Sequence, residues 1–180
     1  MDPTTANKEN STRAGSKVHP ADEICLILTM IVKNESKIIQ RCFESTLYNG
    51  RPIISGMAIV DTGSTDNTMD LIREWAHRYQ IKLHLTQLPF KNFGVNRTNS
   101  IMEAKAAVPN ADYMLFLDAD MLLEFYPDDW EFESTLLKSK VFAGISLFQY
   151  NTTIEYANLR LAKMDVPWTC VMPTHEYYAV

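Results

Sequence analysis

Two aspartates, Asp118 and Asp120, follow directly on the apolar run from Tyr113 to Leu117. Burying one carboxylate costs free energy, and burying two together costs more unless a cation or strong hydrogen-bond donors share the site. Carboxylate oxygens are the ligands that Mg²⁺ and Mn²⁺ prefer, and both ions also bind diphosphates. The pattern therefore predicts a divalent metal at the end of a strand. The alternative is a solvated acidic loop, because Asp-x-Asp by itself is a weak pattern.

A second polar cluster is "VDTGSTDNT", residues 60–68. Asp61 ends an apolar run, Gly63 permits a tight turn, and the polar residues 64–66 can cap a following helix. The carboxylate of Asp61 can accept a hydrogen bond from the imide N–H of uracil or from a ribose hydroxyl. An ordinary capped turn between a strand and a helix explains this segment equally well when it is taken alone.

Three further side chains have types that suit such a site: Arg97, His175 and Glu176. A guanidinium at position 97 could brace the two aspartates or contact a phosphate. A neutral imidazole at His175 can complete a metal shell, and the adjacent carboxylate of Glu176 can act as a general base. The alternatives are a surface arginine and an ordinary surface turn.

Apolar periodicity predicts the elements that would position these residues. Strands are expected at 24–32, 56–61, 81–87, 112–120, 141–150 and 154–164, and helices at 34–50, 63–79, 94–108 and 129–140. Asn34 is the expected cap of the first helix. Strands that alternate with helices indicate an α/β domain with a mostly parallel sheet and helices on both faces. Ligands bind beyond the carboxyl ends of such strands, which is where the polar clusters fall.

Composition limits the class of protein. The 180 residues suit one domain, or most of one, and 46% hydrophobic residues are enough for a core. The net charge of −5 argues against a nucleic-acid partner. Residues 1–22 lack apolar periodicity and are expected to form a disordered tail. No apolar run reaches membrane-spanning length, and three widely spaced cysteines favour a reduced, cytoplasmic chain.

Several motifs together resemble the family 2-like glycosyltransferases of the GT-A fold. The resemblance is carried by "TMIVKNE", "IVDTGSTDNT", "NFGVNRTNS", "FLDAD" and "RLAKMDVPWTCVMPTHEYY", which occur in the family's order between Ile24 and Tyr178. It implies a Rossmann-like GT-A domain over residues 23–180, with a small antiparallel part near the C-terminus. Two features depart from the family. The late motif reads Pro-Thr-His-Glu, and the chain ends soon after it, so we expect either one domain of a longer polypeptide or a compact member of the family.

The resemblance also assigns roles to residues. It implies that Thr29, Asn34 and Glu35 line a nucleoside pocket and that Asp61 contacts the base. It further implies that Asp118, Asp120 and His175 bind Mn²⁺ or Mg²⁺ and that Asp118 helps to hold the donor. Glu176 is the candidate base, and Arg97 is the candidate phosphate contact or brace.

The activity implied is metal-dependent, inverting transfer of a sugar, hexosyl or deoxyhexosyl, from a nucleotide-diphosphate donor, most often a UDP-sugar. The acceptor hydroxyl could belong to a glycan, a protein or a lipid. A sugar nucleotidyltransferase is one alternative, although its glycine-rich loop is replaced here by Lys33-Asn34-Glu35. A non-catalytic module that binds a nucleotide-sugar is the other.

Overall fold

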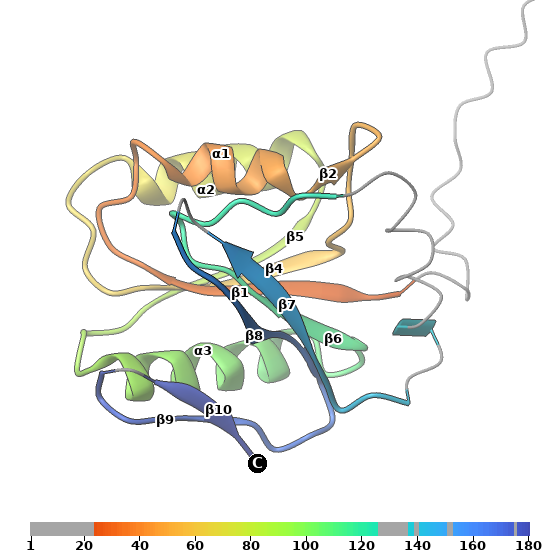
Figure 1. Ribbon diagram of the computed structural model, residues 1–180. Coiled ribbons are helices and arrows are strands. Elements are labelled where there is room, and N and C mark those ends of the chain that lie inside the picture. The colour runs from red at the N-terminus through yellow and green to blue at the C-terminus, as the bar shows by residue number, and fades with distance from the viewer. Residues whose placement is uncertain (1–23, 126–136, 139–140, 151–152, 175) are drawn as a thin grey trace, which may run out of the picture.

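A mixed six-stranded sheet forms the centre of the molecule in the computed structural model (Figure 1), which describes residues 24–125, 137–138, 141–150, 153–174 and 176–180. The strand order is β5-β4-β1-β6-β8-β7. The first four of these strands run parallel to one another, β8 runs antiparallel to β6, and β7 runs antiparallel to β8. The strands are β1 (Leu26–Val32), β4 (Gly56–Asp61), β5 (Lys82–Gln87), β6 (Tyr113–Phe116), β7 (Gly144–Tyr150) and β8 (Glu155–Lys163).

Helices cover both faces of this sheet, so the expected α/β architecture with an antiparallel C-terminal part is confirmed. Figure 1 shows α1 (Ile39–Ser45) and α2 (Thr68–Arg78) on one face and α3 (Phe93–Ala107) on the other. Two small antiparallel pairs complete the described structure. They are β2 (Leu47–Tyr48) with β3 (Arg51–Pro52), and β9 (Thr169–Val171) with β10 (Tyr177–Ala179), which lies beside α3.

The core has two layers because β1 lies in the middle of the sheet and is buried on both faces. Leu26, Leu28, Met30 and Val32 point into the cluster under α1 and α2, whereas Ile27 points into the cluster under α3. This alternation follows from the period of two along a strand. It explains why the sequence of β1 is a continuous apolar run.

The first helix is shorter than expected and does not begin at Asn34. Asn34 adopts a left-handed conformation with φ 56°, and its carboxamide oxygen accepts a hydrogen bond from the Thr65 backbone N–H at 2.7 Å. The helix begins instead at Ile39, after a turn in which the Glu35 carbonyl accepts from the N–H groups of residues 38 and 39. The assignment of Asn34 as the helix cap was therefore wrong.

The fourth expected strand also ends early. It spans Tyr113–Phe116, so Asp118 and Asp120 lie in the irregular segment beyond the strand. The third helix is confirmed, and Asn92 caps it by accepting a hydrogen bond from the Val95 N–H at 2.8 Å. The expected tail at 1–22 lies outside the described residues, as does most of the helix expected at 129–140. None of the described helices has the length and apolar character needed to cross a membrane.

Candidate active site

The carboxyl ends of β1 and β4 meet at one edge of the sheet, where Val32 pairs with Asp61. The loops that follow these two strands are tied together by their own polar groups. The Asn34 N–H donates to the Ser64 hydroxyl at 2.9 Å, and the Glu35 N–H donates to the Thr68 hydroxyl at 2.8 Å. The Asn34 side chain also links the two loops, because its carboxamide oxygen accepts a hydrogen bond from the Thr65 N–H. Asn34 therefore shapes the loop, and the Glu35 carboxylate remains available to a ligand.

Asp61 is fully buried at the end of β4. Its Oδ1 accepts hydrogen bonds from the N–H groups of Gly63 and Ser64, both at 3.0 Å, and from the Gln87 amide at 3.4 Å. Burial by itself would raise the pKa of Asp61, but hydrogen bonds from Ser64, Gly63 and Gln87 outweigh it and hold the pKa below its usual range. Its Oδ2 has no hydrogen-bond donor among the described residues. A carboxylate that is ionised, buried and half-satisfied suits a ligand that brings an N–H or O–H group.

Thr29 does not lie at this edge. It occupies the middle of β1, three residues before Val32, and it is 2% exposed. At about 3.3 Å per residue it stands roughly 10 Å from the end of the strand. Thr29 is therefore not among the residues that meet at this edge, and its place in a nucleoside pocket stays a prediction.

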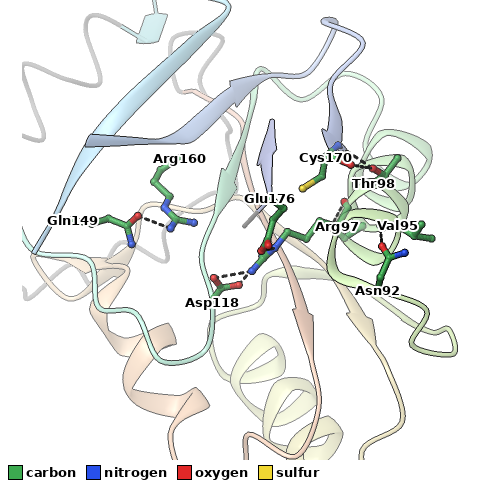
Figure 2. A network of polar contacts seen from close by, with 10 residues as sticks. Asn92, Val95, Arg97, Thr98, Asp118, Gln149, Arg160, Cys170 and Glu176 are labelled. Atoms are coloured by element: carbon green, nitrogen blue, oxygen red, sulfur yellow. Dashed lines mark hydrogen bonds and ion pairs between the residues drawn. The ribbon is translucent and has the colours of Figure 1, made fainter. Parts of the chain in front are cut away.

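Arg97 joins two acidic side chains that are far apart in the sequence. It projects from the second turn of α3, and its side chain is 12% exposed. Its two terminal nitrogens donate to the two carboxylate oxygens of Asp118 at 2.7 and 3.0 Å, and its Nε donates to Glu176 Oε1 at 2.8 Å. Figure 2 shows the guanidinium between the two carboxylates. Burial opposes the charge of Arg97, but the hydrogen bonds and charge of Asp118 raise its pKa, so it stays protonated.

Asp120 and Asp118 face different surroundings, although they are two residues apart. Asp118 is held by Arg97, whereas Asp120 is exposed and accepts no hydrogen bond from the described residues. The negative charges of both carboxylates lie close enough to Glu35 to affect its pKa. Burial raises the pKa of Glu35, and the negative charges of Asp120, Asp66 and Asp118 raise it further. The site therefore carries a local excess of negative charge, which a cation would relieve.

These residues fit a divalent cation held chiefly by Asp120. The donor set consists of carboxylate oxygens, which suit Mn²⁺ and Mg²⁺, and the repulsion on Glu35 is what a bound cation would offset. Both oxygens of Asp118 already accept from Arg97, so its share in a metal shell is secondary. Within the described part of the chain, no group of three or more His, Cys, Asp or Glu side chains is placed so that it could hold a metal ion. His175, the expected third ligand, lies outside the described residues.

The segment that carries Glu176 is anchored on α3 by residues that the sequence analysis did not select. The Cys170 N–H donates to the Thr98 hydroxyl at 2.9 Å, and Gly94 lies so close to the Met172 carbonyl that a Cβ would overlap it. Tyr178 stacks on Phe116 with ring centroids 4.2 Å apart. Gly94 inside a helical pattern was the one sequence signal of this close approach.

Comparison with known proteins agrees with this architecture. The model of "Glycosyl transferase family 2" matches residues 28–131, more than half of the chain. Among solved structures, S. aureus TarS 1-349 is similar with a TM-score of 0.55, at 14% identity, over 73% of this chain and 37% of that chain. The mannosyltransferase PcManGT from Pyrobaculum calidifontis, in complex with GDP-Man and Mn2+, gives a TM-score of 0.49 at 17% identity, over 74% and 38%. No curated protein matches. The fold is thus GT-A-like, and the chain spans about 37% of the TarS structure.

Proposed function

Because the chain belongs to glycosyl transferase family 2, we propose that it transfers a sugar from a nucleotide-diphosphate donor to an acceptor hydroxyl. The observation that carries the proposal is the contact of Arg97 with both Asp118 and Glu176. This contact gathers carboxylates from two distant segments at the edge of the sheet where α/β proteins bind their ligands. The donor is a UDP-sugar and the transferred group is hexosyl or deoxyhexosyl.

The nucleoside binds over the loops that follow β1 and β4. The unsatisfied Oδ2 of Asp61 supports a hydrogen bond to the uracil imide, which is a donor group of the matching kind. The ties between Asn34 and Ser64 and between Glu35 and Thr68 support a loop that is shaped before the donor arrives. A preformed loop lowers the ordering cost of binding.

Asp120, with His175 beside Glu176 and with Asp118 in a secondary role, would hold Mn²⁺ or Mg²⁺. When bound, such an ion neutralises charge on the leaving nucleoside diphosphate. Arg97 has a separate task. It fixes the orientation of the Asp118 carboxylate through two parallel hydrogen bonds, which keeps that side chain from turning toward solvent.

Glu176 is the general base in this proposal. Arg97 holds Oε1, and Oε2 accepts no hydrogen bond from the described residues, so Oε2 is the atom that takes the acceptor's proton. The acceptor oxygen then attacks the anomeric carbon from the face opposite the diphosphate, and the configuration inverts. A glycan, a protein or a lipid could supply the hydroxyl.

The two alternative functions differ in how they are supported. Family membership and Lys33-Asn34-Glu35 in place of a glycine-rich loop both argue against a nucleotidyltransferase. A non-catalytic binding module would use the same nucleotide site without a general base. Binding without turnover is therefore a defined outcome of the experiment below.

The experiment is release of nucleoside diphosphate from a panel of UDP- and GDP-sugars, with Mn²⁺ and with candidate acceptors. We expect release by the wild type and a loss of at least about 100-fold in Glu176→Gln, because general bases contribute that much or more. Affinity for UDP should persist, since the Gln carbonyl can still accept from Arg97. Glu74→Gln, on the exposed face of α2, is the matched control. Metal-dependent UDP binding without any release would identify a binding module, and absence of UDP binding would contradict the proposal altogether.

A further inference from the structure

A cavity of about 830 Å³ lies between the segment that follows β6 and the β7–β8 hairpin. Its volume is within the usual range of ligand pockets. The described residues that matter here are Asp120, Met121, Leu123, Gln149, Arg160 and Leu161, which all line it. Asp120 therefore belongs both to the candidate active site and to the wall of this cavity.

Arg160 brings a positive charge to this wall. The residue is 7% exposed, and one terminal nitrogen donates to Gln149 Oε1 at 2.6 Å, the contact drawn in Figure 2. Among the described residues, its Nε has no hydrogen-bond acceptor and no carboxylate forms an ion pair with it. A buried guanidinium without a counter-charge is costly, since desolvation is not offset. Within the part of the chain that the structure describes, this side chain therefore lacks an anionic partner.

A β-bulge points Arg160 into the cavity. Leu161 pairs with Ile145 and Leu159 pairs with Ser146, so Arg160 is the extra residue between them. In a regular strand the side chains of residues 160 and 161 would point to opposite faces. Here both line the same cavity. Bulges re-aim side chains in this way and are frequent beside active sites.

We propose that Arg160 and Gln149 form a subsite for an anionic group, a phosphate or a carboxylate, in this cavity. The Arg160 guanidinium supplies charged donors, and the Gln149 amide holds it in place. Leucine side chains on the walls lower the local dielectric, which strengthens the attraction. The existence of this subsite is independent of the proposed function. The proposed function enters only in the question of which molecule carries the anion: the nucleotide-sugar donor, through its diphosphate, or the acceptor.

Inorganic phosphate is the probe, and its binding to the full chain is measured by calorimetry and by thermal stabilisation. We expect the wild type to bind phosphate and Arg160→Met to lose at least about tenfold in affinity, as for a hydrogen bond between charged groups. Arg160→Lys should retain part of the affinity. Arg73→Met is the matched control, since Arg73 is an exposed guanidinium on α2.

Gln149→Glu is a second, nearly isosteric test. The new carboxylate would form an ion pair with Arg160 and neutralise its charge. Phosphate binding should therefore be lost while the fold is kept. It decides the question if Arg160→Met does not fold. The proposal is overturned if the wild type does not bind phosphate at tens of millimolar. It is equally overturned if the folded variants bind phosphate as the wild type does.

A third measurement, of phosphate binding in the presence of UDP and Mn²⁺, distinguishes an anion carried by the donor from one carried by the acceptor. If the subsite takes the donor's diphosphate, phosphate competes with UDP in the presence of Mn²⁺, and Arg160→Met weakens UDP binding. If it takes an anionic group of the acceptor, phosphate binds together with UDP, and UDP affinity is unchanged in the variant. A wild type that binds phosphate but not UDP would contradict the proposed function and leave the subsite standing.

Discussion

Arg97 acts on the site through geometry as well as charge. Its planar guanidinium donates three hydrogen bonds, two to Asp118 and one to Glu176, and all three lie between 2.7 and 3.0 Å. A lysine ammonium could not reproduce this fork, because it is a point charge with rotating donors. Both carboxylates therefore depend on one side chain for their orientation.

Replacement of Arg97 by methionine should lower the free energy of unfolding by about 2–3 kcal/mol, because two partly buried carboxylates lose their shared partner. Urea denaturation measures this. Arg78→Met provides the control, since Arg78 pairs with Glu74 on the exposed surface and should cost about 0.5 kcal/mol. Equal urea midpoints for the two variants would show that the Arg97 cluster adds no stability.

The sequence predicted the types of residue at the site better than their contacts. Asp118, Arg97 and Glu176 were selected from separate motifs, but the Arg97 fork depends on how α3 packs against the C-terminal strands, which no local pattern encodes. Thr29 lies three residues before the end of β1, and a sequence pattern does not reveal how far a residue lies from the end of its strand. Arg160 was not selected as a site residue, since a bulge depends on pairing between two strands.

At the scale of elements, the packing of α3 against β9 decides where Glu176 lies. Gly94 permits this packing, because a Cβ at that position would overlap the Met172 carbonyl. The Cys170–Thr98 hydrogen bond fixes the same contact one turn further along the helix. The close approach places the start of β10 within reach of Arg97.

Gly94→Ala should destabilise the protein by about 1–3 kcal/mol, the usual cost of overpacking. The sign of this change in the free energy of unfolding is informative, because alanine in a helix is otherwise favoured over glycine by roughly 1 kcal/mol. Thermal or urea unfolding measures the change. Met102→Ala, an exposed position on the same helix, should change stability very little. A stabilised Gly94→Ala variant would contradict the tight contact with β9.

A second contact of α3 should make stability depend on pH. Glu103 Oε2 lies 2.6 Å from His84 Nε2 and accepts from the Thr86 hydroxyl at 3.0 Å, which ties α3 to β5. The hydrogen bond with His84 lowers the pKa of Glu103, with burial opposing it and Thr86 adding to it. A lowered folded-state pKa adds stability above the ordinary pKa of about 4.3, and that stability is lost as the pH falls through the lowered value.

The measurement is urea unfolding of the wild type and Glu103→Gln from pH 7 to pH 3. The wild type should be more stable by about 0.5 kcal/mol at neutral pH, and the difference should vanish in acid. Asp70→Asn, an exposed acid on α2, is the control. A difference that stays constant down to pH 3 would mean that the Glu103 contact is not the titrating group.

At the scale of the whole molecule, the order of elements was predictable, and some of their ends were not. The buried run of β1 and the helical spacing in α2 depend on local periodicity, so the sequence predicted them correctly, and it also predicted the limits of α3. The predicted start of the first helix was too early, because the Asn34 side chain forms a hydrogen bond with the loop after β4 and does not cap the helix. Strand order could not be read from periodicity, since it depends on contacts between segments distant in sequence.

One measurement tests the central claim most directly: calorimetric titration of the full chain with UDP, with and without Mn²⁺, for the wild type, Asp120→Asn and the control Asp70→Asn. We expect Mn²⁺ to strengthen UDP binding by about tenfold or more in the wild type and the control, since diphosphate and carboxylate oxygens are both ligands that the ion would favour. Asp120→Asn should lose most of this enhancement. An equal Mn²⁺ enhancement in Asp120→Asn, or none in the wild type, would contradict the claim that this edge of the sheet holds a metal and a nucleoside diphosphate.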